Sequence, residues 1–128
     1  MEPSRNFHGA RHNVQKVDKP WGYEVWWART PAYVGKVLHI NRGESLSLQY
    51  HREKEETVMV WTGRMRFEHF REGEPPQTTE MEPGQSFHVS PGLRHRMIAL
   101  ADTDVFEVST PQLDDVVRLE DRYGRGPA

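Results

Sequence analysis

Short segments of alternating apolar and polar residues, separated at close intervals by turn-forming residues, dominate this chain of 128 residues. Pro83-Gly84 and Pro91-Gly92 are two such turn signals. Side chains on a strand alternate between two faces, so the pattern predicts many short strands, as in an all-β sandwich or barrel. The expected strands are residues 22–28, 34–40, 45–50, 57–62, 65–70, 78–82, 86–89, 96–100 and 104–109.

One short helix is expected near the C-terminal end. Thr110 would cap it, Pro111 would be its first residue, and Asp114 and Asp115 would lie at the positive end of its dipole. Residues 1–14 are polar and irregular, so we expect a flexible N-terminal tail followed by a single domain over residues 15–126.

Four candidate metal ligands converge if this strand pattern is correct. In residues 45–51 the odd positions are polar and end in Gln49 and His51, and Glu56 begins the partner strand. His95 follows in a Pro-Gly-x-x-His segment. A lone His or Gln on a strand is usually a surface residue, but the joint pattern indicates a site. Two imidazoles, a carboxylate and an amide oxygen suit a divalent ion (Zn, Mn, Fe, Co or Ni) with an open position.

The positions that alternate with these form an apolar face, even-numbered on the first strand and odd-numbered on the second. If Gln49 and Glu56 point into the interior, a contiguous apolar patch points outward. Such a patch rarely stays in contact with water. A second copy of the chain would cover it, giving a homodimer, and the alternative is cover by the chain's own first strands. The patch comprises Leu46, Leu48, Tyr50, Met59 and Trp61.

Composition excludes several classes of function. The 17 basic and 19 acidic residues give a net charge of −2, which predicts neither a nucleic-acid partner nor attraction to an anionic membrane. The chain has no cysteine, so disulfides and zinc–thiolate sites are excluded, and this fits a cytoplasmic protein. No apolar run approaches the ~18 residues of a membrane helix. The expected partner is a small molecule.

Other polar residues near these motifs are weaker candidates. His88 could act as an acid or base, although a structural hydrogen bond is the more common role of such a residue. Most charged side chains are simply solvated. Six basic residues could contribute to a phosphate clamp: Lys19, Lys36, Arg42, Lys54, Arg94 and Arg96.

Together these motifs resemble the cupins, which place an H-x-H-x(3–4)-E-x(6)-G hairpin against a G-x(5)-P-x-G-x(2)-H-x(3)-N hairpin. Among cupins, the chain is similar to the isomerase domain of type II phosphomannose isomerases over residues 17–126. The resemblance implies a cupin-type double-stranded β-helix (jelly-roll) barrel and a metal held by Gln49, His51, Glu56 and His95. The matching segments are Pro20-Trp21-Gly22, Leu-Ser-Leu-Gln-x-His at 46–51 and Glu-Asp-x-Tyr-Gly-Arg at 120–125.

The resemblance also implies candidate catalytic residues, and here the chain departs from the family. Lys36 and Arg96 match positions that are basic in the isomerases, and Lys54, His88 and Arg96 are the catalytic candidates. The chain does not keep the family pattern His-Arg-x-Glu-His-Trp: Lys54 occupies the position of the Arg, and Thr-Val at residues 57–58 occupies the positions of the His-Trp. In the second motif, Ser and Ala stand at positions 90 and 99, where the family has Pro and Asn.

Two functions from different classes follow. The first is aldose–ketose isomerisation of a sugar phosphate, in which a metal polarises the carbonyl and a base moves a proton between C1 and C2. The second is a metal-binding cupin without isomerase activity, either a small-molecule binding module or another enzyme such as an oxygenase. The match over residues 120–125 favours the first function, and the altered residues around Glu56 favour the second.

Overall fold

The computed structural model describes residue 9 and residues 11–124, and these residues form eleven strands and no helix. The all-β prediction is therefore confirmed, and the expected strands at 34–40, 65–70 and 86–89 have the bounds observed. Two strands, β1 and β11, were not predicted. The strands are β1 (Gln15–Lys19), β2 (Gly22–Arg29), β3 (Val34–Ile40), β4 (Leu48–Tyr50), β5 (Glu56–Thr62), β6 (Met65–Phe70), β7 (Gln77–Met81), β8 (Ser86–Val89), β9 (Arg94–Ala99), β10 (Thr103–Ser109) and β11 (Val117–Glu120).

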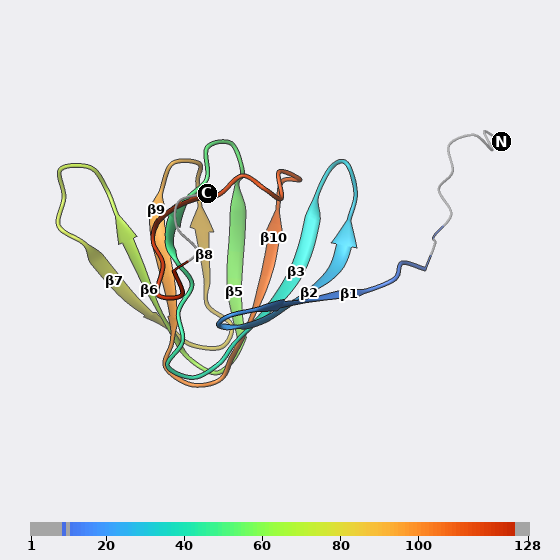
Figure 1. The fold of residues 1–128 in the computed structure, drawn as a ribbon, viewed down its shortest axis with the longest axis horizontal. Coiled ribbons are helices and arrows are strands. Elements are labelled where there is room, and N and C mark those ends of the chain that lie inside the picture. Colours follow the sequence, from blue (N-terminus) through green and yellow to red (C-terminus); the bar gives the residue numbers. More distant parts are fainter. Residues whose placement is uncertain (1–8, 10, 125–128) are drawn as a thin grey trace.

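Two antiparallel sheets face each other and form the jelly-roll barrel (Figure 1). One sheet has the order β1-β2-β3-β10-β5-β8, and the other has the order β11-β4-β9-β6-β7. From β7 onward, the chain changes sheet at every connection. Strands far apart in sequence therefore become neighbours, as where β10 lies between β3 and β5.

The core lies between the inner faces of the two sheets. Along β5 and β6, buried residues alternate with more exposed ones, as the period of two requires. Val58, Val60, Met65, Phe67 and Val105 have no solvent exposure. Full burial of one such side chain stabilises a fold by about 1.5–3 kcal/mol, so this apolar layer supports the polar residues beside it.

The β5–β6 turn requires glycine at position 63. Gly63 has φ +88°, in the left-handed region that other residues rarely adopt. A Cβ added there would lie 2.3 Å from the Asp102 carbonyl oxygen and 2.6 Å from Thr103 Oγ1. The absence of a side chain at position 63 lets the β5–β6 turn pack closely against the β9–β10 connection.

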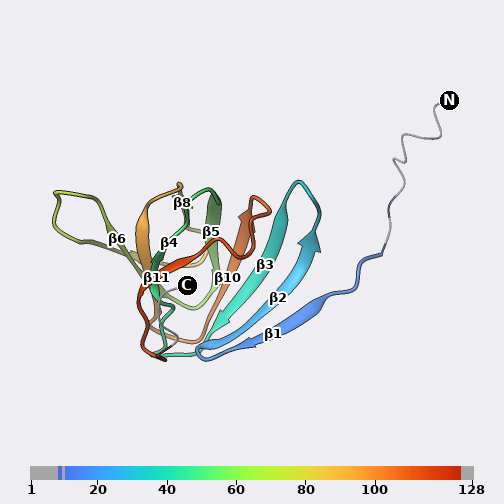
Figure 2. The same ribbon diagram turned by 45° about the horizontal axis from the view of Figure 1, so that its top comes forward.

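The helix expected at Thr110 is wrong. Residues 110–116 form turns, and this segment crosses from β10 to β11 between the two sheets (Figure 2). Its capping groups bind another part of the chain instead. Thr110 Oγ1 accepts the Glu55 N–H at 3.0 Å, and the Asp115 carboxylate accepts the backbone N–H groups of residues 52–54. Tertiary hydrogen bonds have thus replaced the local ones of a helix.

The expected apolar patch is also divided. Leu46 is 8% exposed and belongs to the core, because the alternation fails before β4 begins at Leu48. Leu46 N–H donates to the Met97 carbonyl, outside the regular β4–β9 ladder. Leu48 and Met59 lie on strands of different sheets. Trp61 points outward as expected and is 56% exposed.

The N-terminal end of the described chain leads into β1 at the edge of the six-stranded sheet (Figure 2). Most of the tail expected over residues 1–14, residues 1–8 and 10, lies outside the described residues, as do Arg125 and Gly126 of the C-terminal motif. Within the described part of the chain, no helix has the length and apolar character needed to cross a membrane.

Candidate metal centre

Three strands bring two histidines and one glutamate together inside the barrel. His51 directly follows β4, Glu56 begins β5, and His95 is the second residue of β9. In the β4–β9 pair, Gln49 lies opposite His95. The Gly92 N–H donates to the His51 carbonyl at 2.7 Å, which ties the β8–β9 turn to the end of β4. These contacts bring together His51 and His95, which are 44 positions apart in the sequence.

The ligand atoms of these three residues form a compact cluster. They all lie within 4.8 Å of one another. His51 Nε2 is 2.7 Å from Glu56 Oε1, and His95 Nε2 is 3.6 Å from the same oxygen. Each residue is at most 2% exposed. Two ligands bound at about 2.1 Å to one ion are themselves about 3 Å apart, so the observed spacing suits a shared ion.

The outer nitrogen of each ring fixes the direction of its lone pair. His51 Nδ1 lies 2.6 Å from the Asp115 carbonyl oxygen, and His95 Nδ1 lies 2.8 Å from the Leu93 carbonyl oxygen. Each Nδ1 therefore carries a hydrogen and donates it, which is the usual arrangement behind a metal-binding histidine.

The inner nitrogens then require a cation. In the neutral rings, both Nε2 atoms present lone pairs to the Glu56 carboxylate, and His95 Nε2 is buried without a hydrogen-bond partner. A divalent ion would satisfy His51, Glu56 and His95 together, so the residues present fit a metal.

The Glu56 carboxyl is held in its charged form. Burial raises its pKa, but the close contacts with the His51 and His95 rings and the charge of Lys54 outweigh burial and keep the pKa well below its usual range. A carboxylate that is ionised before an ion arrives is a ready ligand.

Gln49 lies beside this cluster and lines the same cavity. Its Oε1 accepts a hydrogen bond from Ser47 Oγ at 2.7 Å. An amide oxygen has two lone pairs, so one remains for a further contact. Gln49, His51 and Glu56 therefore line one cavity, and His95 joins His51 and Glu56 in the cluster itself.

A network of buried ion pairs continues from Glu56 along one wall. Lys54 Nζ lies 3.8 Å from Glu56 Oε2 and 3.2 Å from Glu107 Oε2. Further along, Lys36 Nζ lies 3.3 Å from Glu24 Oε1. Removing one partner of such a buried pair typically costs about 3–5 kcal/mol, because the other charge stays desolvated.

Burial and neighbouring charges together set the pKa values of two members of this wall, Glu107 and Lys54. Burial, together with the neighbouring Glu56 carboxylate, raises the pKa of Glu107 to about 8. Burial lowers the pKa of Lys54, but the carboxylates of Glu107 and Glu56 outweigh it and the pKa lies above its usual value. Lys54 therefore stays protonated beside the candidate metal cluster.

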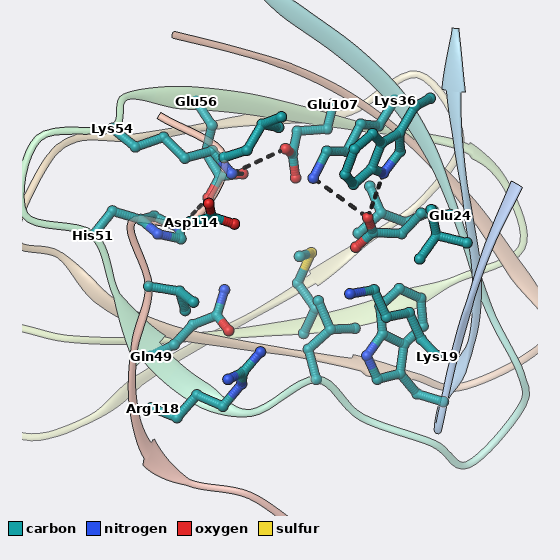
Figure 3. Close-up of a pocket in the computed structure, with 18 residues that line it drawn as sticks. Lys19, Glu24, Lys36, Gln49, His51, Lys54, Glu56, Glu107, Asp114 and Arg118 are labelled. Carbon is teal, nitrogen blue, oxygen red and sulfur yellow. Dashed lines mark hydrogen bonds and ion pairs between the residues drawn. The ribbon is translucent and has the colours of Figure 1, made fainter. Parts of the chain in front are cut away.

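The cavity beside this wall has a volume of about 390 Å³, within the range of small-molecule sites (Figure 3). Trp21, Leu38 and Met97 supply apolar surface. Its charged lining residues are Lys19, Glu24, Lys36, Lys54, Glu56, Glu107, Asp114 and Arg118.

Two of the three predicted catalytic residues lie elsewhere. Lys54 lines the cavity, but His88 and Arg96 do not. His88 projects outward from β8, where its side chain is 57% exposed and pairs with Glu55. Arg96 projects from the outer face of β9 and pairs with Glu68 at 2.9 Å and Glu120 at 3.3 Å. On β8 and β9, the side chains that point inward are those of the residues next to His88 and Arg96.

The position of Thr57 changes the meaning of one departure from the isomerase pattern. Thr57 is half-buried between two buried residues of β5 and does not line the cavity. Val58, the next residue, lies in the core. The lost His at position 57 therefore leaves the inner wall of the cavity unchanged, whereas Lys54 is part of that wall.

Sequence reasoning missed five residues of the site. Glu24 and Glu107 lie on strands that were predicted, but their apolar neighbours on both sides gave no clear inward face. Asp114, Asp115 and Arg118 fall at or after the expected helix, so their direction could not be inferred. An acidic residue within an otherwise apolar strand was the one available signal.

Comparisons with known proteins agree with this architecture. The Cupin domain family model matches residues 36–109. Mannose-1-phosphate guanylyltransferase ManC of Salmonella typhimurium (strain LT2) is 33% identical over 119 residues, which cover 89% of this chain and 24% of that protein. The chain therefore spans about a quarter of this relative.

Solved structures share the fold. KdgF from Halomonas sp. is similar with a TM-score of 0.65 and 25% identity, covering 80% of this chain and 91% of KdgF. CapF, a capsular polysaccharide assembling protein from Staphylococcus aureus, has a TM-score of 0.71 and 18% identity over 92% of this chain and 35% of CapF. Oxalate decarboxylase from Bacillus subtilis has a TM-score of 0.71 and 16% identity, covering 88% of this chain and 33% of the decarboxylase.

Proposed function

This chain belongs to the cupin family, and we propose that it is a metal-dependent enzyme that interconverts the aldose and ketose forms of a small sugar phosphate. The observation that carries the proposal is the orphaned lone pair of His95 Nε2 beside the ionised Glu56, which lines a cavity of about 390 Å³. The resemblance of residues 46–51 and 120–124 to type II phosphomannose isomerases supports the choice of reaction.

His51, Glu56 and His95 would hold the ion, with Gln49 beside them. A divalent ion bound there would act as a Lewis acid on the oxygens of a sugar. The chain's own residues enclose the substrate, and Lys54 fixes the position of Glu56 through their 3.8 Å ion pair. A base must also carry a proton between C1 and C2. The carboxyl groups available in the cavity are Glu24, Glu107 and Asp114.

We expect slow isomerisation of mannose 6-phosphate compared with enzymes that carry the full His-Arg-x-Glu-His-Trp pattern. Lys54 is 5% exposed and is engaged by Glu56 and Glu107. A lysine is a compact point charge, so it cannot grip two oxygens as an arginine fork does. Lys54→Arg should therefore raise turnover, provided that the buried wall accommodates the larger group.

The test combines elemental analysis of protein purified without added metal with a coupled assay on a panel of sugar phosphates. Metal-dependent turnover that is lost in His51→Ala and kept in His88→Ala would support the proposal, since His88 lies outside the cavity. Tight metal binding with no turnover of any sugar phosphate would overturn it. That result would favour a metal-binding cupin without isomerase activity.

A further inference from the structure

Two cations in the cavity have no anionic partner. Lys19 at the end of β1 and Arg118 on β11 both line the cavity, and neither forms an ion pair within the described residues. Arg118 Nε is buried and has no hydrogen-bond partner among the residues that the structure describes. A buried guanidinium donor without an acceptor is costly, so this arrangement is expected where a ligand supplies the acceptor.

The unpaired cations lie across the cavity from the paired ones. Figure 3 shows Lys19 and Arg118 on the side opposite Glu107 and Lys36, with Arg118 pointing inward. Lys36 is neutralised by Glu24, as Lys54 is by Glu107 and Glu56. The cavity therefore has one wall of internally satisfied charges and one wall with free positive charge.

Backbone pairing places the free charge next to the candidate metal ligands. Arg118 on β11 lies opposite Gln49 on β4, and Gln49 in turn lies opposite His95 on β9. A ligand that contacts a metal at His95 can therefore reach Arg118 across Gln49. A small molecule with an oxygen function at one end and an anionic group at the other fits this order.

The charge balance favours a ligand with more than one negative charge. Four basic and at most four ionised acidic residues line the cavity, so the lining carries no net negative charge. A divalent ion at the cluster would leave at least two positive charges uncompensated. A doubly charged anion compensates two of them, whereas a singly charged one compensates only one.

We propose that Arg118, with Lys19, binds a doubly charged oxyanion of the phosphate-ester type. This inference rests on the metal site of the proposed function and identifies the class of its substrate. Arg118 would grip two oxygens of the anion with its planar fork, and Lys19 would add a point charge.

The test measures binding of inorganic phosphate, sulfate and acetate to metal-loaded protein by isothermal titration calorimetry. Phosphate and sulfate should bind at least about tenfold more tightly than acetate, and Arg118→Gln should weaken phosphate binding at least about tenfold. Lys19→Gln, on a different strand, should weaken it less. Arg118→Lys should recover part of the loss because it keeps the charge without the fork.

Arg96→Gln is the matched control, because Arg96 is also an arginine of the five-stranded sheet but pairs with Glu68 and Glu120 outside the cavity. Its phosphate affinity should equal that of the unaltered protein. Unchanged affinity in both Arg118→Gln and Lys19→Gln would overturn the proposal, and acetate binding as tightly as sulfate would overturn the double charge. Turnover is not measured, so Arg118-dependent phosphate binding in a protein without isomerase activity would refute only the proposed function.

Discussion

Removing the carboxylate of Asp115 should loosen the turn that carries His51 and Lys54. This carboxylate accepts the backbone N–H groups of Arg52, Glu53 and Lys54 at 2.9, 2.7 and 2.8 Å. Burial raises the pKa of the Asp115 carboxyl, but these three bonds outweigh burial and hold the pKa below its usual range. The carbonyl of the same residue accepts the His51 Nδ1 hydrogen at 2.6 Å. Asp115 thus ties the C-terminal crossing segment to the candidate metal centre.

The expected cost follows from these bonds. Each intramolecular hydrogen bond contributes about 0.5–1.5 kcal/mol net, so loss of three in Asp115→Ala should lower the free energy of unfolding by about 2–4 kcal/mol. Asp115→Asn keeps one acceptor oxygen and should cost less. Urea unfolding of metal-free protein, followed by tryptophan fluorescence, gives the values by linear extrapolation.

The same change should weaken metal binding. The carbonyl of residue 115 that orients the His51 ring remains but is no longer anchored by the side chain, and loss of such support typically reduces metal affinity by about 10- to 100-fold. Glu53→Ala is the control, because Glu53 lies on the turn held by Asp115, is exposed and does not line the cavity. If Asp115→Ala costs no more stability than Glu53→Ala and binds metal equally well, the reasoning is refuted.

Three further outcomes are expected. His51→Ala should abolish stoichiometric metal in elemental analysis, and unchanged metal content would show that His51 is not a ligand. Trp61 is 56% exposed and its ring stacks on that of Phe106 at 5.2 Å, so we propose that this outer face of β5 joins two chains. Light scattering should then give twice the 15.0 kDa of one chain, and Trp61→Glu should weaken the association. Gly63→Ala should destabilise the fold by more than about 2 kcal/mol, because it adds a clash with Asp102 to the strain of the left-handed backbone. Gly73→Ala is the control: an added Cβ there meets nothing within 4 Å, so only the backbone strain of about 1–2 kcal/mol should appear.

The regular strands were predictable because each rests on a local pattern. Along β5 the period of two placed Glu56, Val58 and Val60 on one inward face, and the structure buries all three. Turn residues then limited each strand, as Gly63 does after β5. Where alternation is irregular, prediction failed: Leu46 lies in the core although its parity with Leu48 placed it outside.

The helix expected at Thr110 failed for a different reason. Thr110, Pro111 and the Asp pair form a good local signal for a helix start. In the structure, side-chain oxygens of Thr110 and Asp115 instead accept hydrogen bonds from the backbone N–H groups of residues 52–55, and no local sequence pattern predicts these contacts. Tertiary contacts therefore decided the path of the C-terminal segment.

The sequence by itself determined the donor chemistry of the candidate centre. Side chains at Gln49, His51, Glu56 and His95 supply an amide, two imidazoles and a carboxylate, and strand periodicity alone indicated a common direction for those on the first hairpin. The spacing of turns likewise determined the all-β class.

Only the tertiary structure decided which charges are free to meet a ligand. Lys36, Lys54 and Arg96 were candidates from sequence, yet each is neutralised by a carboxylate on another strand. Arg118 lies at the cavity without such a partner because β11 pairs with β4. Charge depends on residue type, but neutralisation depends on distance in space, and strand pairing across the barrel sets that distance.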